Sequence, residues 1–154
     1  MRAFGPTMEP FAELRPGIRR LVAPNSSMMT GPGTNTYLFG EEEIAVLDPG
    51  PDIRIHREAI LERAEAPIRW ILATHTHPDH SPGARILAEI TGATVLGRPA
   101  PEGRHQDDTF EPHVSLNDGE KLETGEFVLE AVHTPGHASN HICFLHAASN
   151  WLFT

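Results

Sequence analysis

The stretch His75-Thr76-His77-Pro78-Asp79-His80 holds an unusually dense group of residues that can bind metal ions. Its three imidazoles and one carboxylate provide the nitrogen and oxygen ligands that suit zinc and related divalent ions. In an extended segment the side chains of His75 and His77 project to the same side, so both can bind one metal. Asp79 and His80 follow where the chain turns, and they can face a second position nearby. Because a bound metal ion can activate water as a nucleophile, the stretch predicts a hydrolase.

A second motif, Thr134-Pro135-Gly136-His137, follows a predicted strand far along the chain. Proline and glycine favour a tight turn, which determines where the His137 side chain points. A third imidazole at this place would complete a tripod with His75 and His77. Such a tripod leaves one position open for water, which is typical of catalytic rather than structural zinc sites.

Composition indicates one folded domain. The chain has 154 residues, of which 39% are hydrophobic and 21% charged, and its net charge of −9 argues against a nucleic-acid surface. The single cysteine, Cys143, lies in an apolar run, so we expect a buried packing residue and a reducing, cytoplasmic location. The first 30 residues lack the apolar core of a signal peptide, and no stretch is long enough to span a membrane. We therefore expect a soluble protein without a membrane partner.

Apolar runs separated by glycine and proline predict strands that alternate with two helices, so the expected fold class is α/β or α+β. Residues 1–17 are expected to be an irregular lead-in, and residues 97–113 a surface excursion. One helix is predicted over 53–66 with Asp52 as its N-cap, and another over 82–90 with Ser81 as its cap. The predicted strands are 18–23, 36–39, 44–47, 68–73, 94–96, 127–132, 141–147 and 151–154.

Together the two motifs resemble those of the metallo-β-lactamase superfamily. The resemblance rests on the HxHxDH motif of residues 75–80 and on the TPGH motif that ends at His137. Asp48-Pro49-Gly50, after an apolar strand, is similar to the family's Asp-x-Gly turn beneath the site. Segments 33–38 and 137–141 are similar to those of one branch, the lactamase-like endoribonucleases and their bacterial relatives.

The resemblance implies a ligand role for five residues. His75, His77 and His137 would hold a first metal ion, and Asp79 and His80 would contribute to a second. The expected cofactor is Zn²⁺, as one or two ions, with iron or manganese as alternatives because these ligands accept several metals.

The resemblance also implies roles behind the ligands. Asp79 is expected to be catalytic, because its carboxylate could orient the activated water and move its proton. Asp48 would hydrogen-bond a ligand imidazole and fix its tautomer. His133 and His141 are further candidates for such supporting roles. The remaining histidines are expected to be structural or solvent-exposed: His56, His105, His113 and His146.

The family fold is a four-layer αββα sandwich of two similar halves, and residues 18–154 resemble the N-terminal half. In the family the last strand continues into a Gly-Asp pair whose Asp bridges two metals, and a further His ligand follows. The sequence ends at Thr154, so we expect that a missing C-terminal half or a second chain completes the fold. A single sheet with helices on one side would leave its other face without a partner.

Two functions compete at this point. The first is a zinc-dependent metallo-hydrolase that acts on a phosphodiester (RNA-like) or an ester or thioester substrate. The alternative is a metal-binding fragment without catalytic activity, since the bridging Asp and the later His ligand are absent. Whether the substrate is a small molecule or RNA stays open.

Overall fold

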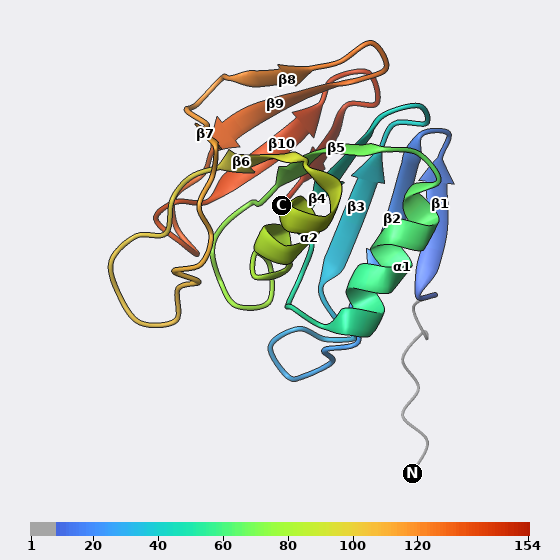
Figure 1. Cartoon of the computed structure of the whole chain (residues 1–154). Coiled ribbons are helices and arrows are strands. Elements are labelled where there is room, and N and C mark those ends of the chain that lie inside the picture. Colours follow the sequence, from blue (N-terminus) through green and yellow to red (C-terminus); the bar gives the residue numbers. More distant parts are fainter. Residues whose placement is uncertain (1–8) are drawn as a thin grey trace.

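The computed structural model describes residues 9–154, which form two β-sheets and two helices (Figure 1). The helices are α1 (Arg54–Ala64) and α2 (Gly83–Thr91). The larger sheet contains, in spatial order, β1 (Phe11–Arg15), β2 (Ile18–Val22), β3 (Asn35–Phe39), β4 (Ile44–Leu47), β5 (Ile68–Leu72), β6 (Thr94–Gly97) and β7 (Val114–Ser115). The smaller sheet contains β11 (Trp151–Phe153), β10 (Ile142–His146), β9 (Val128–His133) and β8 (Lys121–Glu123).

These elements stack in three layers, with the helices on one face of the larger sheet and the smaller sheet on the other (Figure 1). Strand β4 shows why both faces are covered, because all four of its residues are apolar and buried. Ile44 and Val46 belong to the core beneath the helices, whereas Ala45 and Leu47 belong to the core between the sheets. A strand buried on both faces has this continuous apolar pattern. The predicted α/β class is confirmed.

The prediction that one face of the sheet lacks a partner is wrong. Phe39 and Phe144 are fully buried between the two sheets. The ring of Phe39 lies 4.9 Å from that of Phe153 and 5.9 Å from that of Phe127, measured between centroids. The later strands fold back over the first sheet because their inward-facing side chains are large and apolar, and this burial is the main stabilising term.

The predicted irregular lead-in is also partly wrong. Residues 1–8 lie outside the described residues, but Phe11–Arg15 form β1, antiparallel to β2. Pro16 and Gly17, which suggested a loop, form the hairpin turn, and Gly17 has a φ of 75°. The guanidinium of Arg63 lies 4.3 Å from the ring centre of Phe11, so α1 holds this edge strand from above.

The helices occur where they are predicted, but their predicted caps do not form. Helix α1 begins after Ile53 without a side-chain cap, and the Asp52 carboxylate instead pairs with Arg57. Helix α2 begins after Pro82, and the Ser81 hydroxyl donates to a carboxylate oxygen of Asp107 at 2.6 Å. In both cases another side chain, Arg57 in the same helix or the distant Asp107, replaces the backbone amide as the partner of the predicted cap.

The predicted surface excursion of residues 97–113 is anchored to the rest of the fold. Phe110 is buried in the core beneath the helices, and Asp107 is buried beside the metal-binding motif. Neither of the two helices has the length and apolar character that crossing a membrane would need.

Candidate metal centre

The candidate metal centre lies where loops from the two sheets meet. Strands β4 and β5 run parallel, so the Asp48 turn and the loop of residues 73–82 leave the larger sheet at the same edge. The backbone amide of Ile142 donates to the carbonyl of Thr74 at 2.8 Å, which joins the start of β10 to the end of β5. This bond brings the loop that carries His137 to the first motif.

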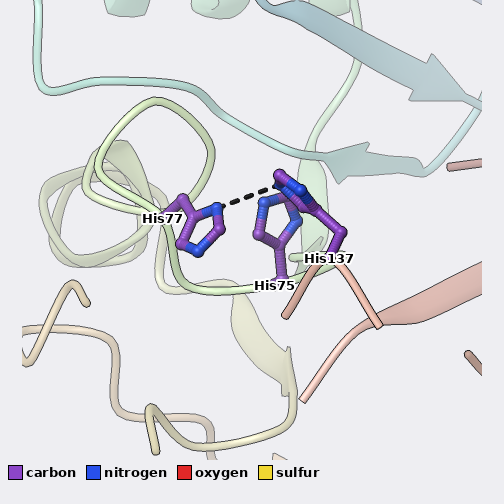
Figure 2. Close-up of side chains that lie close together, drawn as sticks. All are labelled: His75, His77 and His137. Carbon is purple, nitrogen blue, oxygen red and sulfur yellow. Dashed lines mark hydrogen bonds between the residues drawn. The ribbon is translucent and has the colours of Figure 1, made fainter. Parts of the chain in front are cut away.

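His75, His77 and His137 lie together at this junction (Figure 2). Each offers one ring nitrogen such that all three nitrogens lie within 4.8 Å of one another. Nδ1 of His77 and Nε2 of His137 are 3.1 Å apart and share a hydrogen bond. His75 is buried, His77 is half-buried and His137 is exposed, so the group opens to solvent on one side.

Burial keeps two members of the group uncharged. Burial, followed by the neighbouring imidazoles of His80 and His77, lowers the pKa of His75 to about 2. Burial also lowers the pKa of His77, with His137 as the next contributor. A neutral imidazole has the free lone pair that a metal requires.

Asp48 orients two imidazoles, that of His80 directly and that of His75 through Thr74. Its carboxylate accepts hydrogen bonds from the Thr74 amide at 2.7 Å, the Thr74 hydroxyl at 2.8 Å and Nδ1 of His80 at 2.8 Å. Since the Thr74 hydroxyl gives its proton to Asp48, it must accept the proton of His75 Nδ1, 2.8 Å away. The Nε2 atoms of His75 and His80 are thereby left as the nitrogens that face the site.

The turn that carries Asp48 is itself supported from helix α1. Asp48 has a φ of 51°, which is uncommon for a residue with a side chain. The Thr36 hydroxyl donates to the Asp48 carbonyl at 2.6 Å and accepts from Nε2 of His56 at 2.8 Å. His56, expected to be structural, therefore holds the turn indirectly.

Asp79 and His80 lie beside the histidine group without belonging to it. The His80 ring centre is 4.2 Å from that of His75, and its Nε2 is 3.3 Å from Oδ2 of Asp79. Burial lowers the pKa of His80, but the charges and hydrogen bonds of Asp48 and Asp79 outweigh it and raise the pKa to about 10. The hydrogen bond from His80 likewise lowers the pKa of Asp79 to about 2, against its partial burial.

The two further candidates for supporting roles differ in position. His141 is buried, its ring centre lies 4.9 Å from that of His75, and its Nδ1 pairs with the Thr134 hydroxyl at 2.9 Å. His133 donates from Nε2 to the Ser139 carbonyl at 3.2 Å, so its contact is with the loop of His137 rather than with a predicted ligand.

A pocket of about 420 Å³ opens beside His77 and His137, and Met29 also lines it. Sequence reasoning missed Thr74, Thr36 and Met29 as parts of this region. Thr36 and Met29 lie far from the histidine motifs in the sequence, so no local pattern connects them with the site. A hydroxyl next to the HxH pair is the one signal that could have indicated Thr74.

Residues 29–154 match the model of the metallo-beta-lactamase superfamily. The chain is 40% identical over 104 residues to a hydroxyacylglutathione hydrolase of Pseudomonas paraeruginosa, covering 68% of this chain and 38% of that protein. It is 33% identical over 139 residues to the thioesterase pkgB of Emericella nidulans, covering 88% and 38%.

Solved structures agree with these matches at the level of the fold. A metallo-beta-lactamase mutant from Cronobacter sakazakii superposes with a TM-score of 0.75 at 19% identity, over 94% of this chain and 62% of that one. The chain belongs to the metallo-β-lactamase superfamily. It spans well under half the length of the two curated relatives named above.

Proposed function

We propose that the protein is a metal-dependent hydrolase that holds zinc through His75, His77 and His137 and acts on an ester or thioester. The observation that carries this proposal is Nε2 of His75, a buried nitrogen without any hydrogen-bonding partner. A buried polar atom left unpaired is costly, and in native proteins it usually has a functional explanation. Here the atom faces two other imidazoles at the spacing of a metal site.

The donor set fits zinc. Three neutral imidazoles with one open side are the ligands of a catalytic rather than a structural zinc site. A bound zinc ion would act as a Lewis acid and lower the pKa of a water molecule to about 7. We further propose that Asp79 and His80 serve a second ion: Asp48 already holds Nδ1 of His80, so its Nε2 would become a ligand once the ion displaces the proton that it shares with Asp79.

The chain's own residues would then orient the reaction. The Asp79 carboxylate lines the pocket and is ionised at neutral pH, so it can accept a proton from a water beside it. The Asp48 and Thr74 hydrogen bonds hold the His75 and His80 rings in fixed orientations. Such preorganisation lowers the cost of reaching the reacting geometry.

Charge and surface chemistry favour an ester or thioester over RNA. A net charge of −9 repels a phosphodiester backbone unless a basic surface offsets it. The side chains of Met28 and Met29 are fully exposed, and Met29 lines the pocket, where it can contact the apolar part of an acyl group. Two relatives are named as a thioesterase and a hydroxyacylglutathione hydrolase, which is consistent with this choice.

One observation favours the alternative of a metal-binding chain without turnover. Among the described residues, only the three histidines form a group with the spacing of metal ligands, whereas Asp79 and His80 pair with each other. That alternative predicts a single ion, bound by His75, His77 and His137, and no hydrolysis.

The test combines metal analysis with two substrates. We expect the purified chain to bind about one or two zinc ions and to hydrolyse a glutathione thioester but not single-stranded RNA. His75→Asn should abolish zinc binding and hydrolysis. His105→Asn is the matched control, because His105 is exposed and its φ of 67° suits asparagine.

The outcomes distinguish the hydrolase from the metal-binding alternative, and a thioester substrate from RNA. No zinc binding by the wild-type chain would refute the proposal. Zinc binding without turnover on either substrate would favour the metal-binding alternative, and cleavage of RNA alone would overturn the substrate assignment.

A further inference from the structure

A buried polar cluster joins the loops that carry the three histidines, and the chemistry proposed above does not use it. Its centre is Asn140, three residues after His137 and only 6% exposed. The Asn140 amide nitrogen donates to Oγ1 of Thr76 at 2.9 Å and to the carbonyl of Pro99 at 3.2 Å. The Asn140 side chain thereby binds two segments that precede it in the sequence, Thr76 by 64 positions and Pro99 by 41.

Thr76 is the partner in the first motif, and it lies between His75 and His77 with no exposed surface. Its hydroxyl donates to Oε1 of Gln106 at 2.6 Å and accepts the proton from Asn140. Its carbonyl accepts the backbone amide of Asp107 at 2.7 Å. A single threonine is therefore fixed through both its backbone and its side chain.

The direction of these bonds indicates what they do. Both hydrogen bonds of the Thr76 hydroxyl run between loops rather than within one loop, so they set the position of each loop relative to the others. Asn140 also keeps its Oδ1 buried without a partner, which is an energetic cost that a purely apolar packing residue would avoid. A cost of this kind is retained where geometry matters more than stability.

We propose that Asn140, Thr76 and Gln106 form a positioning clamp that sets the distance of His137 from His75 and His77. The clamp rests on the proposed metal-binding function, because its purpose is to hold three imidazoles at ligand spacing. Residues behind metal ligands commonly change metal affinity by about 10- to 100-fold when they are replaced.

The test uses two substitutions that remove the hydrogen bond between Asn140 and Thr76, and two control substitutions, all in the intact chain. Asn140→Ala removes the donor, and Thr76→Val removes the hydroxyl while nearly keeping the shape of the side chain. Thr76→Ser keeps the hydroxyl. Ser149→Ala removes a 2.8 Å hydrogen bond to His146 in the β10–β11 turn, at the opposite end of β10 from the site.

Zinc affinity is measured by competition with a chelating dye, and site geometry by the visible spectrum of the Co²⁺-loaded protein. We expect Asn140→Ala and Thr76→Val to weaken zinc binding by about 10- to 100-fold and to alter the Co²⁺ spectrum. Thr76→Ser and Ser149→Ala should stay within about twofold of the wild type. The proposal is overturned if Asn140→Ala and Thr76→Val both fold and bind zinc like the wild type, or if neither of them folds while Thr76→Ser does.

A metal-free readout separates this proposal from the proposed function. In the chain without metal, an NMR cross-peak between the rings of His77 and His137 reports their 3.1 Å hydrogen bond. The clamp predicts that Asn140→Ala loses this cross-peak and that Ser149→Ala keeps it. A wild-type chain that shows the cross-peak but binds no zinc would refute the proposed function and leave the clamp to be judged by this result.

Discussion

Asp48→Asn should remove the stability that the Asp48–His80 pair gives the metal-free protein at neutral pH. The substitution keeps the shape of the side chain and an oxygen for the Thr74 amide, but it removes the charge that faces Nδ1 of His80 at 2.8 Å. His80 then loses the larger of its two carboxylate partners. With burial opposed by Asp79 alone, we expect the pKa of His80 to fall from about 10 to below its ordinary value of 6.5.

The magnitude follows from the pKa. The difference between about 10 and 6.5 corresponds to about 5 kcal/mol as an upper limit. Breaking a buried pair by removing one partner typically costs about 3–5 kcal/mol, and the His80 side chain is only 20% exposed. We expect the free energy of unfolding to fall by about 3–4 kcal/mol at pH 7.

The sign of the pH dependence is determined by the raised pKa. A group whose pKa is higher in the folded state stabilises that state fully below its unfolded pKa, here 6.5. The stabilisation is lost as the pH rises toward about 10, where folded His80 loses its proton. The difference between wild type and Asp48→Asn should therefore be largest at about pH 6, slightly smaller at pH 7, and shrink toward pH 10.

Urea unfolding of the chelator-treated protein across this pH range measures the effect. The same substitution in a His80→Gln background serves as the control, because the pH-dependent part of the difference must vanish when His80 is absent. A difference between wild type and Asp48→Asn that is constant with pH, or smaller than about 1 kcal/mol at pH 7, would show that the Asp48–His80 pair is not the source.

Three further outcomes are expected. Phe39→Ala should lower the free energy of unfolding by about 3–5 kcal/mol in urea titrations, because this ring is fully buried between the sheets. Glu126→Gln should lower the thermal midpoint at pH 7 more than at pH 3, since the Glu126 carboxylate accepts the backbone amides of residues 41–43 and these bonds lower its pKa. Burial lowers the pKa of His56 to about 4, so the wild type should lose stability as the pH falls from 6.5 to 4; His56→Gln, which can still donate to Thr36, should show a smaller loss by circular dichroism.

The sequence alone determined the ligand types and most of the local structure. The spacing of the HxHxDH motif and the turn before His137 placed five candidate side chains on loops at strand ends, and the structure brings three of them within ligand distance. The apolar run Ile44–Leu47 marked a strand, and glycine and proline marked where elements stop. These features are local, because they follow from side-chain chemistry and from the period of a strand or helix.

The tertiary structure decided which surfaces meet. The cover that the smaller sheet provides and the partner of Ser81 depend on segments distant in sequence, so no periodicity shows them. Only the packed loops distinguish His141, which lies against His75, from His133, which does not.

The same holds for the supporting residues of the site. Thr74 and Asn140 look like ordinary polar residues in the sequence. In the structure, each is buried where the backbones of two loops converge, and each takes its partners from across that junction. The residue types that can bind a metal are thus a local property of the chain, whereas the hydrogen bonds that orient them exist only after apolar burial has brought distant loops together.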